Sequence, residues 1–175
     1  MKVVAILFDL GDVIMKEETE VKDAELNTQH ADLVDGMADA LRVLKSRGYK
    51  FGLVADTRPM TAWNVLHQHH LYDLFDVLAI SEEVGCEKPD RRIFLYALDK
   101  LYIEPQDYGR VLMIGNNLAR DVRGANQVGI VSVWFHWNER YAHANDGAVP
   151  KYTVHDASEL MELIEKLEAR IQVNM

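Results

Sequence analysis

The feature that most constrains the fold is a series of short apolar runs, each followed by a segment with helical spacing. The first run covers residues 3–8, and further runs cover residues 51–55, 77–80, 111–114, 130–135 and 152–154. Runs of this length without polar alternation are typical of strands buried on both faces of a parallel sheet. Their alternation with helices predicts βαβ units. The sequence therefore predicts a doubly wound, Rossmann-like α/β fold, with one parallel sheet and helices on both of its faces.

The helices are predicted from the spacing of apolar residues and from the residues that end each segment. Helical spacing begins near Val34 and stops at Gly48, and further helices are expected over residues 60–69, 92–101, 119–128 and 157–171. Residues 15–30 are acidic and lack periodicity, so we expect a surface excursion there. With no linker, repeat or low-complexity tract, the 175 residues fit a single domain over residues 1–175.

The charge balance excludes several classes of partner. The chain has 19 basic and 28 acidic residues, a formal net charge of −9. Nucleic acid is not expected as a partner, because binding its phosphates requires clustered Lys and Arg. No membrane contact is expected either, since no apolar run approaches the roughly 18 residues of a membrane span. The single cysteine, Cys86, excludes an internal disulfide framework and predicts a cytoplasmic protein.

Polar residues follow the predicted strands, at the edge where doubly wound sheets bind their ligands. Residues 9–12 follow the first strand, residues 55–58 the second, and residues 115–121 the fourth. Lys88 lies in the loop before the helix expected from residue 92. Because the carboxyl ends of parallel strands meet at one edge of the sheet, we expect these loops to share one site.

These loops carry four segments that resemble the motifs of the haloacid dehalogenase (HAD) superfamily, whose members are mostly aspartate-nucleophile phosphatases. The segments are residues 8–14, 53–57, 83–90 and 114–125, so the resemblance covers nearly the whole chain. Each segment alone is weak evidence, whereas four of them in order, each at a strand end, are specific. The resemblance implies a HAD-like core and a phosphatase-type hydrolase.

The resemblance also implies a nucleophile and a metal site. Asp9 would attack phosphorus and would be a ligand of Mg²⁺, and the Gly11 backbone carbonyl would be a second ligand. Asn116 and Asp121 would be the remaining metal positions. A carboxylate nucleophile forms an aspartyl-phosphate and so divides one difficult displacement into two easier ones.

A second group of residues is implied to bind the phosphoryl group. Lys88 would neutralise its negative charge, which matters because phosphoryl transfer depends mainly on positioning and electrostatic stabilisation. The backbone near Asp56 and the hydroxyl of Thr57 would hold a phosphoryl oxygen.

Three positions depart from the family pattern. Gly11 stands where the phosphatases usually carry a second Asp, which acts as general acid and base. Ala55 replaces a Ser or Thr that would hold a phosphoryl oxygen, and Asn116 replaces an Asp, so weaker Mg²⁺ binding is expected. The residues leave open whether Asp12 or Thr57 compensates for the missing groups.

Two functions are compatible with this pattern. One is a Mg²⁺-dependent phosphatase that cleaves a phosphomonoester or an acyl or sugar phosphate through an aspartyl-phosphate at Asp9. The other is a catalytically degenerate scaffold that binds a partner or regulates it. The short stretch between the first two motifs allows a flap over residues 15–30 and no cap domain, so an open site is expected. An open site suits a large substrate, a partner surface, or a homo-oligomer in which a neighbouring subunit covers it, and it argues against dehalogenation. The expected partner is a small phosphorylated metabolite or a phosphorylated macromolecule.

Overall fold

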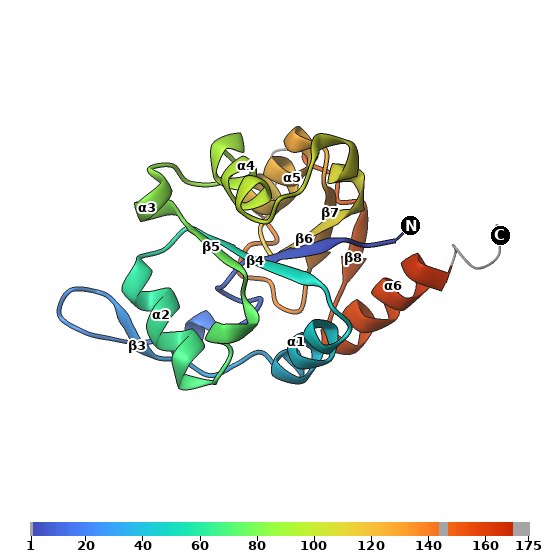
Figure 1. Ribbon diagram of the computed structural model, residues 1–175. Helices are drawn as coiled ribbons and strands as arrows, with labels where there is room; N and C mark the ends of the chain where they lie inside the picture. Colours follow the sequence, from blue (N-terminus) through green and yellow to red (C-terminus); the bar gives the residue numbers. More distant parts are fainter. Residues whose placement is uncertain (1, 144–146, 170–175) are drawn as a thin grey trace.

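Six parallel strands form the central sheet of the protein (Figure 1). The structure is a computed structural model and describes residues 2–143 and 147–169. The strands, in chain order, are β1 (Ala5–Phe8), β4 (Lys50–Ala55), β5 (Val77–Ile80), β6 (Val111–Gly115), β7 (Val131–Phe135) and β8 (Tyr152–Val154). Their spatial order is β5-β4-β1-β6-β7-β8. The chain runs outward from β1 through β4 to β5, then crosses back to β6 on the other side of β1 and continues outward to β8. The predicted doubly wound α/β fold is confirmed.

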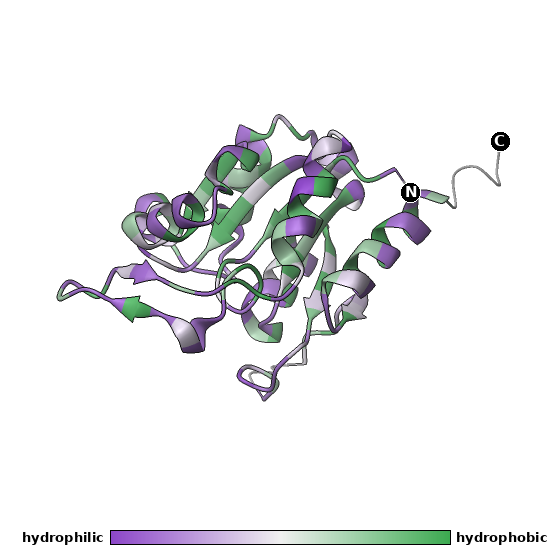
Figure 2. Ribbon diagram, turned by 90° about the horizontal axis from the view of Figure 1, so that it is seen from below, coloured by the Kyte–Doolittle hydropathy of each residue, from purple (hydrophilic) through white to green (hydrophobic). Residues whose placement is uncertain are grey.

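Helices cover both faces of this sheet, as Figure 1 shows. One face packs against α1 (Met37–Ser46), α2 (Pro59–Gln68) and α6 (Ala157–Ala169), and the other against α4 (Arg91–Lys100) and α5 (Arg123–Val128). The strands are mostly hydrophobic, whereas the helices carry hydrophilic residues on their outer sides (Figure 2). Two apolar cores result, one on each side of the sheet. In the described residues, no helix combines the length and the apolar character that crossing a membrane requires.

Some helices differ from the sequence prediction. The segment expected as one helix over residues 119–128 consists of a π-helical turn, η4 (Leu118–Val122), followed by α5. A short helix α3 (Ser81–Val84) follows β5 directly and was not predicted, because four residues carry no helical periodicity. The 3₁₀ turns η2 (Tyr72–Leu74) and η3 (Pro105–Arg110) complete the connections. Residues 170–171 of the last predicted helix lie outside the described residues.

The segment between β1 and α1 contains a small hairpin. A 3₁₀ turn η1 (Glu17–Thr19) precedes the antiparallel strands β2 (Val21–Lys22) and β3 (Thr28–His30). The sequence predicted an aperiodic excursion here and missed the hairpin, because its strands are short and largely polar. Polar contacts fix it to α2: the Thr28 N–H donates to Thr61 Oγ1 at 2.9 Å, and Asn64 Nδ2 donates to the Thr28 carbonyl at 2.8 Å. We call residues 15–30 the flap.

Candidate active site

A cavity of about 540 Å³ opens at the carboxyl ends of β1, β4 and β6. Its position follows from the strand order, since β1 lies between β4 and β6 and the loops after all three strands meet there. The residues to which the motifs assign a role all line this cavity: Asp9, Gly11, Asp56, Thr57, Lys88, Asn116 and Asp121. Segments far apart in the chain therefore contribute to one site, as expected from the parallel sheet.

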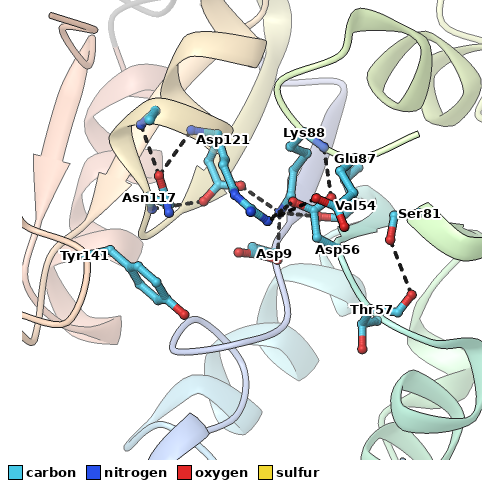
Figure 3. A network of polar contacts seen from close by, with 12 residues as sticks. Asp9, Val54, Asp56, Thr57, Ser81, Glu87, Lys88, Asn117, Asp121 and Tyr141 are labelled. Carbon is cyan, nitrogen blue, oxygen red and sulfur yellow. Dashed lines mark hydrogen bonds and ion pairs between the residues drawn. The ribbon is translucent and has the colours of Figure 1, made fainter. Parts of the chain in front are cut away.

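A buried lysine connects the two carboxylates at the base of the cavity (Figure 3). Lys88 Nζ lies 2.7 Å from Asp9 Oδ1 and 2.7 Å from Asp121 Oδ1. It also donates a hydrogen bond to the Val54 carbonyl at the end of β4, at 2.9 Å. The Lys88 side chain is 2% exposed and that of Asp121 is 1% exposed, whereas Asp9 is more open at 15%. The most accessible carboxylate of the cluster is therefore the predicted nucleophile.

Burial and charge determine the protonation of this cluster. Burial, reinforced by the nearby Asp121 carboxylate, raises the pKa of Asp9 to about 7, against the opposing effect of Lys88. Burial alone would lower the pKa of Lys88, but the carboxylates of Asp121 and Asp9 outweigh it and raise that pKa above its usual value. With two carboxyl groups and a single ammonium, the cluster is deficient in positive charge, and a cation in the cavity would favour the ionised form of Asp9.

Asp56 positions the loop that carries Lys88. Its Oδ1 accepts a hydrogen bond from the Lys88 backbone N–H at 2.9 Å, and its Oδ2 accepts one from Arg120 Nη1 at 2.9 Å. The side chain of Asp56 thus joins the end of β4 both to the lysine loop and, through Arg120, to η4 after β6. Thr57 lines the cavity, and its carbonyl accepts a weak hydrogen bond from Ser81 Oγ at 3.4 Å.

The position of Asp121 depends on two residues that precede it. Asn117 donates its backbone N–H to Asp121 Oδ2 at 3.0 Å, and its side-chain Oδ1 caps η4 by accepting from the N–H groups of Ala119 and Arg120. Gly115 at the end of β6 has no Cβ, and a Cβ built there would lie within 2.5 Å of Asp121 Oδ2. Sequence reasoning did not single out Asn117, although an Asn directly before a helix is a recognised capping signal.

The donor atoms around the cavity fit a hard divalent cation. Asp9 and Asp121 supply carboxylate oxygens, and Asn116 supplies an amide oxygen. The Nδ2 of Asn116, which is buried without a hydrogen-bond partner among the described residues, is an N–H donor and not a ligand. Mg²⁺ prefers oxygen ligands and is often held by one or two carboxylates, with the substrate phosphate completing the set. Among the described residues there is no cluster of three or more His, Cys, Asp or Glu side chains suited to a metal. A metal site here would thus depend on the amide and on backbone oxygens as well.

Asp12 is engaged in holding the flap. Its Oδ1 accepts a hydrogen bond from the Glu17 N–H at 2.9 Å, and its Oδ2 accepts one from Arg140 Nε at 2.6 Å. The Asp12 side chain is fully buried and does not line the cavity. The Asp12 carboxylate therefore holds the flap in place. These contacts do not support a role for Asp12 as a replacement for the acid that is missing at Gly11.

Glu17 and Tyr141 are cavity residues that the sequence reasoning missed. The Tyr141 hydroxyl donates a hydrogen bond to Glu17 Oε2 at 2.8 Å, and both side chains line the cavity opposite Lys88. Burial raises the pKa of Glu17 above its ordinary value, against the hydrogen bond from Tyr141. No local motif could have identified this pair, because the two residues are 124 positions apart.

The comparison with known protein families matches this chain over residues 9–129, a segment that contains all of the predicted site residues. The matching model is that of the haloacid dehalogenase-like hydrolases. The chain belongs to this family.

Individual relatives of this HAD-family chain are phosphatases and nucleotidases by name. It is 33% identical over 135 residues to a glyceraldehyde 3-phosphate phosphatase of Pyrococcus furiosus, covering 77% of this chain and 54% of the relative. It is 32% identical over 152 residues to the pyrimidine 5'-nucleotidase YjjG of Escherichia coli, covering 86% of this chain and 65% of the relative. The chain thus spans little more than half to about two thirds of the length of these relatives.

Solved structures share the fold of this HAD-family chain. The HAD-hydrolase YfnB of Bacillus subtilis, solved with bound magnesium, superposes with a TM-score of 0.76 at 17% identity, covering 94% of this chain and 99% of that one. At 17% identity the similarity demonstrates a shared fold only. It supports the HAD-like core that the motifs predicted.

Proposed function

We propose that this HAD-family chain is a Mg²⁺-dependent phosphatase that acts through an aspartyl-phosphate at Asp9. The observation that carries the proposal is the contact of Asp9 with the buried ammonium of Lys88, 2.7 Å away at the base of an open cavity. Lys88 and the Leu10 N–H both contact Asp9 Oδ1. Within the described residues Oδ2 has no such partner, and it is the oxygen that we assign to the attack on phosphorus.

The chain's own groups supply most of the required chemistry. Asp9 Oδ2 displaces the leaving group from phosphorus, and water then releases phosphate from the acyl-phosphate and regenerates the carboxylate. Lys88 orients Asp9 and neutralises negative charge on the phosphoryl oxygens, which is the main requirement of this reaction. Bound Mg²⁺ would add positive charge at the same oxygens, with Asp9, the Gly11 carbonyl, Asn116 and Asp121 as its proposed ligands.

A small phosphorylated metabolite is the proposed substrate class. The relatives named for glyceraldehyde 3-phosphate and for pyrimidine nucleotides support this class, and a cavity of about 540 Å³ has room for either kind of molecule. The flap carries Glu20 at the mouth of the cavity, where its negative charge would repel polyanions such as nucleic acid. We propose that the flap serves here in place of a cap domain, and that the protein works in the cytoplasm, which its single unpaired cysteine supports.

A substrate panel tests this proposal. Phosphate release would be measured from aryl, acyl, triose, sugar and nucleoside phosphates with Mg²⁺ and with a chelator, for the wild type and for Asp9→Asn. Asp35→Asn is the matched control, because the Asp35 side chain is 94% exposed. We expect Mg²⁺-dependent release that Asp9→Asn abolishes and Asp35→Asn preserves. No release at excess Mg²⁺, or equal release by Asp9→Asn, would contradict the proposal.

The second candidate function is a scaffold that binds phosphorylated ligands without turning them over. Ala55 lines the cavity where the family usually places a hydroxyl, and Asn116 contributes no charge. This candidate predicts that a substrate of the panel binds, as measured by calorimetry, while no phosphate is released. Turnover that disappears in Asp9→Asn would exclude it.

A further inference from the structure

A carboxylate occupies the space next to Gly11, the position that lacks the expected second Asp. A Cβ built on Gly11 would lie 2.9 Å from both Cγ and Cδ of Glu17 and closer still to its Oε1. The nearest neighbours of that Cβ are thus the atoms of a carboxylate on η1. The side chain of Glu17, which comes from the flap, occupies the space that a side chain at position 11 would take.

Glu17 is held in this volume from two sides. Its backbone N–H donates to Asp12 Oδ1 at 2.9 Å, which fixes the start of η1 above Gly11. Its Oε2 accepts the hydroxyl of Tyr141 at 2.8 Å and lies 3.8 Å from Arg140 Nε. These contacts leave Oε1 toward Gly11 and the cavity, where Asp9 also lies. A carboxyl group is therefore fixed in the site while one of its oxygens is left for a substrate.

Neighbouring acidic residues do not share this arrangement. Glu18, the next residue of η1, is exposed and does not line the cavity. Glu20 lines the cavity mouth, but its Oε1 accepts the hydroxyl of Thr28 and its Oε2 pairs with Lys22. Only Glu17 among these acids combines a place beside Gly11 with an oxygen directed to the cavity.

We propose that Glu17 is the general acid and base of the phosphatase reaction, replacing in space the side chain that Gly11 lacks. The inference rests on the proposed function, since it assigns a further catalytic residue to that same reaction. In the first half-reaction Asp9 Oδ2 forms a bond to phosphorus, the bond between phosphorus and the ester oxygen breaks, and the Glu17 carboxyl proton moves to that oxygen. The products are an alcohol, the aspartyl-phosphate and the Glu17 carboxylate.

The second half-reaction restores both residues. The Glu17 carboxylate accepts a proton from a water molecule whose oxygen attacks phosphorus, and the bond between phosphorus and Asp9 Oδ2 breaks. Inorganic phosphate leaves, Asp9 is again a carboxylate and Glu17 is again protonated. The cycle consumes one water and needs no other reactant.

The test compares leaving groups. Glu17→Gln keeps the size of the side chain and an oxygen for Tyr141 but cannot transfer a proton. With glycerol phosphate, whose alkoxide leaves poorly, we expect kcat to fall by about 10²–10⁴, the usual contribution of a general acid. With p-nitrophenyl phosphate, whose leaving group needs no proton, the first-turnover burst of nitrophenolate should stay close to that of the wild type, which also shows that the variant folds. Its later steady-state release should fall, because the second half-reaction has lost its base. Glu18→Gln is the matched control and should behave as the wild type on both substrates.

A rescue variant makes the assignment specific. Gly11→Asp alone places a new side chain in volume that Glu17 holds, so we expect little gain from it. Combined with Glu17→Ala, which empties that volume, Gly11→Asp should restore turnover of glycerol phosphate above that of Glu17→Ala. Equal losses in the first turnover of both substrates for Glu17→Gln, or no loss on either, would overturn the assignment while leaving the phosphatase in place. A wild type without Asp9-dependent activity would overturn the proposed function and this inference with it.

Discussion

A single methyl group added at Gly115 should reduce the activity of the protein far more than it reduces the stability. Gly115→Ala adds a Cβ at the end of β6, within 2.5 Å of Asp121 Oδ2 and closer still to the Cβ and Cγ of Asp121. These are the inner atoms of a buried side chain and cannot swing away as the end of a flexible chain would. Asp121 must therefore shift, and with it the 2.7 Å contact to Lys88.

The expected magnitude follows from this overlap. Overpacking a buried site costs about 1–3 kcal/mol. For a chain of this size that cost corresponds to a decrease in Tm of roughly 2–12 °C. A displacement of about 1 Å at a catalytic group can reduce the rate about 10²-fold. We therefore expect Gly115→Ala to lower kcat far more than its loss of stability explains.

Two other glycines provide the controls. A Cβ on Gly124 would overlap the ring of Phe94 in the core beside α4, away from the cavity, whereas a Cβ on Gly109 would meet nothing within 4 Å. In thermal melts Gly124→Ala should lose stability as Gly115→Ala does, and Gly109→Ala should be nearly neutral. Both should keep the phosphatase activity at temperatures where they are folded. A Gly115→Ala variant with wild-type Tm and activity would refute the reasoning.

Three further predictions concern charge. Asp56→Ala removes the acceptor of the Lys88 N–H, so we expect kcat to fall by about 10²-fold, the effect of a misplaced catalytic group, with a smaller change in KM. Asn116→Asp adds a negative charge to the proposed metal site, so Mg²⁺ should bind more tightly in a titration followed by the fluorescence of Trp134, whose indole donates to the Asn116 carbonyl. Although partial burial opposes its ionisation, hydrogen bonds from Lys45 and a backbone N–H hold the pKa of Asp76 below its ordinary value. The stability that Asp76 contributes is therefore present above its unfolded pKa of about 4 and lost as the pH falls through its lower folded pKa. Asp76→Asn should reduce the loss of unfolding free energy as the pH falls from the unfolded pKa of Asp76 to its folded pKa.

Each of these predictions has a matched control. Glu87→Gln alters an exposed partner of Arg120 at 3.6 Å and should not reproduce the effect of Asp56→Ala. Asp73→Asn changes a nearby exposed aspartate whose side chain makes no hydrogen bond or ion pair with the described residues, and it should leave the acid limb of the stability curve intact. Unchanged Mg²⁺ affinity in Asn116→Asp would contradict its place among the ligands, and an unchanged acid limb in Asp76→Asn would contradict its stabilising role.

The sheet could be predicted because its strands are buried on both faces and so carry apolar runs that stand out in the sequence. The hairpin could not, since β2 and β3 are short, largely exposed and largely polar, and depend on α2 for their contacts. Likewise, the loops after the strands could be predicted to converge, because parallel topology alone brings their ends together. Which side chain of each loop turns inward depends on packing that is not local.

The cavity illustrates this limit. Asp9 and Lys88 are found from motifs that are contiguous in the chain. Asp56 was expected to contribute backbone groups to phosphate binding, and its side chain has a further role that the sequence did not predict, because it holds the Lys88 loop. Glu17 could not be found at all, since its role depends on the space left by Gly11 and on Tyr141 from a distant loop. Contacts between distant segments are what a single sequence reports least well.

The contacts between the flap and the loop after β7 also affect the order in which the parts of the site form during synthesis. Glu17 meets Tyr141, and Asp12 meets Arg140 and Trp137, across separations of 124–128 residues. Chains emerge from the ribosome from the N-terminus. The nucleophile and its lysine can therefore be paired once β6 and η4 have emerged, while Glu17 has no fixed position until residue 141 follows. Before residue 141 has emerged, a nascent chain lacks the hydroxyl that holds the Glu17 carboxyl beside Gly11.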